Sequence, residues 1–173
     1  LTNRSRSDPR KQRCAPLLKP LNGDVWRMTV TSFPFGDSRW WFLKRCAYET
    51  EHLEIEITEG IVAQDAEDIE IAGRVLSGSR RIEVTPASRQ FRLTFPDALA
   101  VRIVSESYAR PDRHGEPATH PLRRYEQSEF LDHVRSSTLL ESLRSGEFRH
   151  YGLVLADDVI DIVTLGEPAI EAL

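Results

Sequence analysis

The chain has 173 residues, of which 40% are hydrophobic and 29% are charged. These proportions exclude a collagen-like or fully disordered chain and fit one globular domain. A domain of this size buries roughly 70% of its unfolded surface, so a single core can stabilise it without disulfides or metal ions. The apolar runs span only a few residues, far short of the roughly 20 that cross a bilayer, and we therefore expect no membrane partner.

Charge is distributed unevenly along the sequence. Residues 1–20 carry six basic residues and one acidic residue, a net charge of +5. The whole chain has 23 basic and 27 acidic residues, so residues 21–173 carry 17 basic and 26 acidic residues, a net charge of −9. An acidic body repels nucleic acid and favours a partner with a basic surface. We predict a basic, disordered leader over residues 1–20 and a single α+β domain over residues 21–173.

Cysteines and nucleotide-binding motifs are sparse. Cys14 and Cys46 are the two cysteines, too few for a disulfide framework, and two reduced thiols are typical of a cytoplasmic protein. The histidines His114 and His120 share a proline-rich loop, but their spacing matches no metal-ligand pattern. No glycine-rich phosphate-binding motif is present. The sequence therefore predicts neither a metal ion nor a cofactor.

Period-two alternation dominates the pattern of side chains. Leu53, Ile55 and Ile57 alternate with Glu54 and Glu56, which is typical of a half-buried strand. Similar patterns predict strands over 25–33, 39–48, 81–85, 91–95, 99–106, 148–155 and 159–164, whereas 63–78 reads as a loop with one short strand. Successive strands lack the helical crossover that parallel pairing needs, so the sheet is predicted to be antiparallel.

A helical period appears once, late in the chain. Ser128 is a candidate N-cap for a first short helix, and Thr138 with Glu141 fits a capping box for a second that ends at Gly146. Residues 109–124 hold three prolines and are the longest predicted loop. The predicted fold is α+β: a mainly antiparallel β-sheet (meander or half-barrel) with one or two short helices near residues 128–145 and a C-terminal β-hairpin.

Three separated segments resemble a family of small uncharacterised bacterial proteins. The first runs from Phe95 to Glu106 and resembles F-x-D-V-x-A-Y-R-V-x-x-E. The second is Ser128-Glu129-Phe130-Leu131, which resembles an S-x-F-L helix, and the third is His150-Tyr151 followed by residues 157–162, which resembles H-Y-x-I-x-T-x-N-D-x-I-D-V. The sequence departs from these patterns at Val101, where they have an aromatic residue, and at Asp157, where they have asparagine. The resemblance carries no known activity; in size and β-rich design these proteins are similar to immunity partners of toxins.

One carboxylate stands out among the candidate site residues. Asp161 shares its strand face with Val159 and Val163, and a buried carboxylate needs a partner, for which Arg102 is the candidate. A tight turn near Asp157 would place Asp161 opposite Leu153 or Val154, several ångströms beyond hydrogen-bond reach of His150. No serine or cysteine stands in a diagnostic context, so no catalytic residue is predicted. The candidate binding residues are Arg102, Glu106, His150, Tyr151, Asp158 and Asp161.

Three functions fit these observations. The leading hypothesis is a cytoplasmic, non-enzymatic protein-binding module, such as an immunity-type partner of a toxin, that presents an acidic face to a basic partner. The alternative is a small enzyme or ligand-binding protein with an Arg/Glu/His/Asp pocket. The third is a structural protein that self-associates through the aromatic run Trp40-Trp41-Phe42, of which one tryptophan must face the core.

Overall fold

A computed structural model describes residues 34–109, 120–125 and 128–173. The predicted leader over 1–20, the predicted strand over 25–33 and most of the predicted 109–124 loop lie outside the described residues. The strands of the described part are β1 (Trp41–Glu49), β2 (His52–Glu59), β3 (Ile61–Ile71), β4 (Arg74–Glu83), β5 (Gln90–Phe95), β6 (Ala98–Ser105), β7 (Leu122–Tyr125), β8 (Arg149–Val154), β9 (Asp158–Thr164) and β10 (Ala169–Ala172). The helices are the 3₁₀ turn η1 (Glu106–Tyr108), α1 (Glu129–Ser137) and α2 (Leu140–Leu143).

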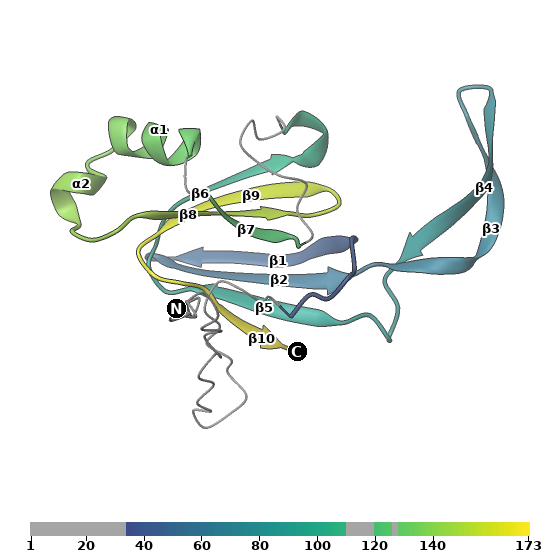
Figure 1. The fold of residues 1–173 in the computed structure, drawn as a ribbon, viewed down its shortest axis with the longest axis horizontal. Helices are drawn as coiled ribbons and strands as arrows, with labels where there is room; N and C mark the ends of the chain where they lie inside the picture. Colours follow the sequence, from purple (N-terminus) through teal and green to yellow (C-terminus); the bar gives the residue numbers. More distant parts are fainter. Residues whose placement is uncertain (1–33, 110–119, 126–127) are drawn as a thin grey trace, which may run out of the picture.

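Two four-stranded antiparallel sheets face each other (Figure 1). The first has the strand order β1-β2-β5-β10 and the second β6-β9-β8-β7, and β3 pairs with β4 in a separate two-stranded ribbon. The antiparallel pairing and the two short helices agree with the predicted α+β class. The single meander or half-barrel is not what the structure has, because the chain crosses from one sheet to the other between β5 and β6 and crosses back between β9 and β10.

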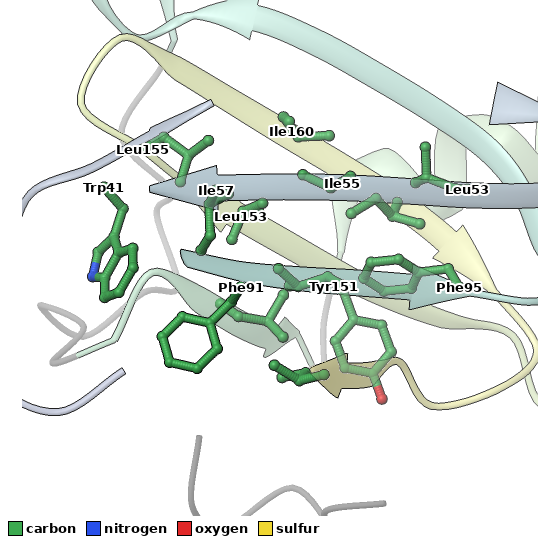
Figure 2. Close-up of a cluster of buried hydrophobic side chains, with 14 of the residues drawn as sticks. Trp41, Leu53, Ile55, Ile57, Phe91, Phe95, Tyr151, Leu153, Leu155 and Ile160 are labelled. Atoms are coloured by element: carbon green, nitrogen blue, oxygen red, sulfur yellow. The ribbon is translucent and has the colours of Figure 1, made fainter. Parts of the chain in front are cut away.

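The core lies between the two sheets (Figure 2). The alternating residues Leu53, Ile55 and Ile57 of β2 point into it, as the sequence predicts, and meet Leu153 of β8 and Ile160 of β9 from the opposite sheet. Each sheet contributes one apolar face, and burial of these facing side chains is the main force that holds the sheets together.

An aromatic cluster closes one end of this core. Trp41 is buried, and its ring contacts those of Phe35 and Phe91 with centroid separations of 5.4 and 5.5 Å. Trp40, the neighbouring residue, is exposed, so one tryptophan of the aromatic run faces the core as predicted. The aromatic density of residues 39–48 is typical of a strand buried on both faces, but β1 lies at the edge of the described sheet and its Lys44 and Arg45 are exposed.

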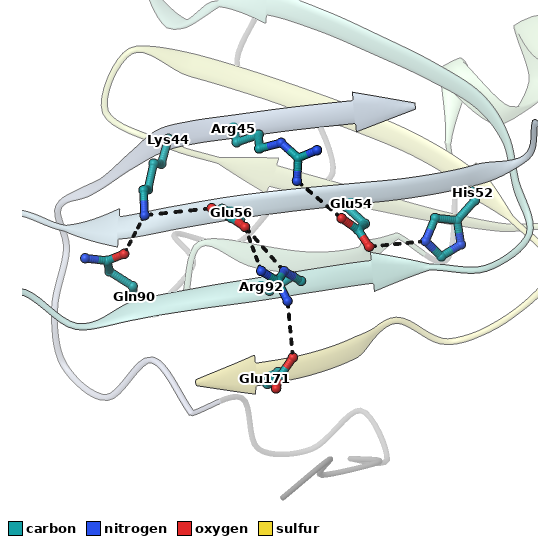
Figure 3. Close-up of polar contacts among 8 residues, drawn as sticks. All are labelled: Lys44, Arg45, His52, Glu54, Glu56, Gln90, Arg92 and Glu171. Atoms are coloured by element: carbon teal, nitrogen blue, oxygen red, sulfur yellow. Dashed lines mark hydrogen bonds and ion pairs between the residues drawn. The ribbon is translucent and has the colours of Figure 1, made fainter. Parts of the chain in front are cut away.

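The outer face of the first sheet carries a lattice of ion pairs (Figure 3). Glu56 accepts from Arg92 at 2.9 Å and lies 3.8 Å from Lys44, while Glu54 lies 3.4 Å from Arg45. The hydrogen bond from Arg92 lowers the pKa of Glu56, against the opposing effect of desolvation. The acids on this face of the first sheet are therefore neutralised by basic side chains on neighbouring strands.

The helices cover the outer face of the second sheet. Ser128 is the N-cap of α1, since its Oγ accepts from the Leu131 N–H at 2.8 Å, as predicted. Val134 of α1 and Leu140 of α2 pack with Val163 of β9 in a second apolar cluster. None of the helices in the described residues is long and apolar enough to cross a membrane.

Candidate functional site

The predicted carboxylate lies beneath helix α1 with its predicted partner. Arg102 on β6 stands directly opposite Asp161 on β9, and its Nε and Nη2 donate to Asp161 Oδ2 at 3.0 and 2.7 Å. Asp161 is only 5% exposed, whereas the Arg102 side chain is 53% exposed and lies over the ring of Phe130, 4.6 Å from its centroid. The pairing of Arg102 with Asp161 is confirmed, and the arginine links the buried acid to the surface.

His150 belongs to the same cluster, contrary to the sequence-based geometry. Its Nε2 lies 3.0 Å from Asp161 Oδ1, although the two residues were expected to be out of hydrogen-bond reach. Asp161 faces Gly152 rather than Leu153 or Val154, and His150 faces Val163, so His150 and Asp161 are diagonal neighbours on one face of the sheet. Such diagonal positions are within reach of long side chains.

Gly152 makes this arrangement possible. Gly152 follows His150 by two residues on β8 and lies directly opposite Asp161. Because glycine has no side chain, nothing at this position separates the imidazole of His150 from the carboxylate of Asp161. A Cβ at this position would lie 2.5 Å from Tyr125 Cε2, which belongs to the ring that occupies the space above the glycine. That ring stacks on His150 with a centroid separation of 4.5 Å. Gly152 therefore lets the tyrosine and the imidazole pack against the sheet.

Ser128 completes a chain of polar contacts. Its Oγ lies 2.7 Å from His150 Nδ1 while it accepts from the Leu131 N–H. The polar cluster, defined here as Ser128, His150, Asp161 and Arg102, therefore joins the start of α1 to three strands of the second sheet. Sequence reasoning assigned Ser128 as a helix cap but did not connect it with His150, because the two are 22 residues apart and meet only through the packing of α1 on the sheet.

The hydrogen-bond directions in the polar cluster follow from its donors. The direction is certain at one end of this series of contacts: Arg102 donates and Asp161 accepts. A guanidinium can only donate hydrogen bonds, and an ionised carboxylate can only accept them. Burial opposes ionisation of Asp161, but the hydrogen bonds from His150 and Arg102 outweigh it and hold the pKa of Asp161 below its ordinary value. In its neutral form, His150 carries its proton on Nε2, facing Asp161, and presents the Nδ1 lone pair to the Ser128 hydroxyl.

The remaining predicted site residues lie elsewhere. Tyr151 points away from the polar cluster into the core between the sheets, where it packs against Phe95 (Figure 2). Glu106 is exposed on η1, and Asp158 begins β9 opposite Ser105. The structure thus brings together Arg102, His150 and Asp161 and separates them from the other three. Within the described residues, no three His, Cys, Asp or Glu side chains come together in a group that could hold a metal ion.

A second feature is the ribbon formed by β3 and β4, which projects from the sandwich (Figure 1). The segment 63–78, predicted to be a loop with one short strand, is a long hairpin in which Ala72 and Gly73 both have positive φ (50° and 76°), as a two-residue type I′ turn requires. Neither strand contributes a residue to the apolar clusters of the described part. Two-stranded hairpins are marginally stable alone, so the ribbon gains little from its own packing.

The tip of the ribbon exposes apolar side chains, with Val75 on one face and three others on the opposite face. Ile69 pairs directly with Leu76, and Ile71 follows on the same side of the strand, because alternate residues of a strand share a face. Ile71 and Leu76 are 57% and 51% exposed. We call Ile69, Ile71 and Leu76 the tip patch.

Acidic residues accompany the tip patch. Strand β3 carries Asp65, Glu67, Asp68 and Glu70. Glu67 pairs with Arg81 at 3.0 Å and Asp68 accepts from the Gly78 N–H at 3.1 Å. Asp65 and Glu70 have no ion-pair partner among the described residues, so this strand, rather than the outer face of the first sheet, carries acids whose charge is not neutralised locally.

No protein-family model, curated protein or solved structure matches this chain.

Proposed function

We propose that this protein is a protein-binding module that holds a partner with the tip of its β3–β4 ribbon. The observation that carries this proposal is the tip patch: apolar side chains that stand in solvent on a ribbon that adds nothing to the core. An exposed group of apolar residues with polar neighbours is typical of an interaction surface. Burial of Ile71 and Leu76 against a partner would stabilise both the complex and the ribbon.

Charge favours a basic partner. The unneutralised acids Asp65 and Glu70 lie on the same strand as the tip patch, and residues 21–173 have a net charge of −9. Complementary charge steers association and sets specificity more than it raises affinity. A partner with a basic rim around an apolar groove fits this ribbon, and the outer face of the first sheet, where acids and bases alternate, fits it less well.

Within this class we propose an immunity-type protein that acts on a toxin in the bacterial cytoplasm. The resemblance of the three segments Phe95–Glu106, Ser128–Leu131 and 150–162 to small bacterial proteins supports the bacterial origin, and the low number of cysteines supports a reducing compartment. A toxin with a basic surface, encoded beside this protein, would be the partner.

The tip patch gives a direct test of the binding proposal. In the double variant Ile71→Ser/Leu76→Ser, partner binding is expected to weaken at least about tenfold, because full burial of each side chain contributes about 1.5–3 kcal/mol. The free energy of unfolding is expected to change by less than about 0.5 kcal/mol, since the substituted residues are exposed. The measurement is affinity capture from a lysate of the source organism, followed by titration of the purified partner.

The matched control replaces two exposed apolar residues by serine in another part of the chain. Leu139 and Leu143, at α2, are also exposed, so Leu139→Ser/Leu143→Ser removes two exposed apolar side chains far from the ribbon in sequence. The control is expected to capture the same partner as the wild type. If no captured protein distinguishes the tip variant from the control, the ribbon is not the binding element and the proposal fails.

A further inference from the structure

Helix capping does not account for all the contacts that Ser128 makes in the polar cluster. The Ser128 hydroxyl, the His150 imidazole and the Asp161 carboxylate are linked by contacts of 2.7 and 3.0 Å, and each group in turn can donate its proton to the next. An N-cap needs only an acceptor oxygen, and the Leu131 N–H already supplies its donor. Capping therefore does not explain why the hydroxyl lies 2.7 Å from a buried imidazole whose other ring nitrogen contacts a carboxylate.

We propose that Ser128 is a nucleophile activated by His150 and oriented by Asp161, which makes the polar cluster a site for acyl transfer from carboxylic esters. A serine hydroxyl becomes a nucleophile when a neighbouring base accepts its proton and a third group orients that base. In the well-known serine hydrolases the serine contacts Nε2 and the acid contacts Nδ1. Here the two ring nitrogens exchange roles, and either nitrogen can accept a proton.

The surroundings of the imidazole favour this chemistry. His150 is 4% exposed, and its ring is covered by Tyr125 at 4.5 Å and Phe130 at 5.4 Å between centroids. These rings keep water away from the contact between His150 and Asp161, which strengthens it. Ser128 is only partly buried, whereas His150 and Asp161 are buried, so the serine is the member of this triad that stands nearest to solvent.

The start of α1 supplies donors for the charge that develops during attack. The Leu131 N–H already donates to Oγ and stabilises negative charge on it. The amides of the first helical turn have no acceptor within the helix, so those of Glu129 and Phe130 can donate to an oxyanion. The helix dipole adds to this effect, because its positive end points at the serine.

The reaction balances with water as the co-reactant. Ser128 Oγ forms a bond to the ester carbonyl carbon while its proton passes to His150 Nδ1. Collapse of the tetrahedral intermediate breaks the bond to the alkoxide, which leaves with the proton from Nδ1 as an alcohol. Water then attacks the acyl group on Ser128, giving up one proton to Nδ1, and the carboxylic acid departs as Oγ recovers its hydrogen.

A fluorophosphonate probe tests the assignment on the full chain. Attack of Oγ on phosphorus displaces fluoride and leaves a covalent phosphonate on the serine. Trypsin releases residues 125–135 as one peptide, in which Ser128 is the single serine and there is no threonine. We expect a stable adduct on Ser128 in folded wild-type protein, found by tandem mass spectrometry, and none after heat denaturation.

Substitutions in the polar cluster distinguish a serine that His150 activates from a serine that His150 merely contacts. His150→Gln is expected to abolish labelling, and Asp161→Asn to slow it by about 100-fold or more, because the imidazole is then free to take the wrong tautomer. Ser136→Ala, which removes an exposed serine of the same helix that donates to the His133 carbonyl, is the matched control and should label as the wild type does. Folded wild-type protein with no adduct on Ser128 would overturn the proposal, and so would labelling that is equally fast in Asp161→Asn.

Discussion

Replacement of Tyr151 by alanine is expected to lower the free energy of unfolding by about 3–5 kcal/mol, the range for removal of a large side chain from a core. Tyr151 is fully buried between the sheets and contacts Phe95 with a ring separation of 5.8 Å. The cavity left by alanine would lie where the two sheets meet, so both would lose packing. Urea unfolding followed by circular dichroism measures the change.

Tyr151→Phe is the matched control, since it keeps the ring and removes only the hydroxyl. Tyr151 Oη is buried and makes no well-formed hydrogen bond within the described residues. Burial also raises the pKa of Tyr151, with the nearby Glu167 adding to the effect, which keeps the hydroxyl neutral. Loss of a hydroxyl without a partner costs little, so Tyr151→Phe is expected to stay within about 1 kcal/mol of the wild type or to exceed it. A large loss in Tyr151→Phe would instead assign the hydroxyl a role.

Asp161→Asn is expected to lower the free energy of unfolding by about 2 kcal/mol at pH 7, the range for hydrogen bonds to a charged group. Asparagine can still accept from His150, but its amide cannot accept two donors from Arg102 as a carboxylate does. Arg102 can turn to solvent because its side chain is 53% exposed, which keeps the loss below that for a fully buried ion pair.

The effect of Asp161→Asn should depend on pH in a defined direction. The folded-state pKa of Asp161 lies below its unfolded value, so the unfolded state takes up a proton at higher pH than the folded state. The stability that Asp161 contributes is therefore complete above the unfolded pKa of about 3.9 and is lost as the pH falls toward the folded value. The difference between wild type and Asp161→Asn should shrink when unfolding is repeated near pH 3.

Asp157→Asn is the control for this pair of measurements. Asp157 is an exposed carboxylate in the turn before β9, and within the described part of the chain its side chain makes no hydrogen bond or ion pair, while its backbone carbonyl accepts from the Glu106 N–H. Its substitution is expected to change stability by less than about 0.5 kcal/mol at either pH. A deficit of Asp161→Asn that stays the same at both pH values would mean that the carboxylate is not ionised through its contacts with His150 and Arg102.

The core strands were predictable because their pattern is local. In β2, the alternation of Leu53, Ile55 and Ile57 with charged residues determines which side faces the core, whatever the strand pairs with. The N-cap at Ser128 is local as well. How the strands divide into two sheets is not local: it depends on where the chain turns from β5 into β6, and a short turn between strands is compatible with either a hairpin or a change of sheet.

The polar cluster forms only in one pairing register of β8 and β9, and the sequence pattern does not determine that register to within one residue. With Asp161 opposite Leu153, His150 would lie on the other face of the sheet, because a shift of one residue reverses every side chain. The observed partner is Gly152, which returns His150 to the same face as Asp161. The pairing of β8 with β9 thus differs by one residue from the pairing of Asp161 with Leu153, and that difference decides whether the histidine and the carboxylate meet.

The ribbon escaped prediction for a related reason. Its register shifts between Val62 and Ala66 and again between Glu67 and Ile69, so the side chains of β3 do not alternate strictly. A β-bulge inserts a residue and breaks the period on which strand prediction depends. The turn begins at Ala72, which adopts a positive φ although alanine seldom does. The residue type at this position therefore does not predict a turn.

The most direct test of the polar cluster is the protonation state of the His150 ring in solution. Long-range proton–nitrogen correlation NMR on ¹⁵N-labelled protein at neutral pH distinguishes a protonated from an unprotonated ring nitrogen. For the neutral form of the ring, the contacts with Ser128 and Asp161 predict a proton on Nε2 and a bare Nδ1. A ring with its proton on Nδ1, or one that exchanges freely between the two forms, would contradict the arrangement.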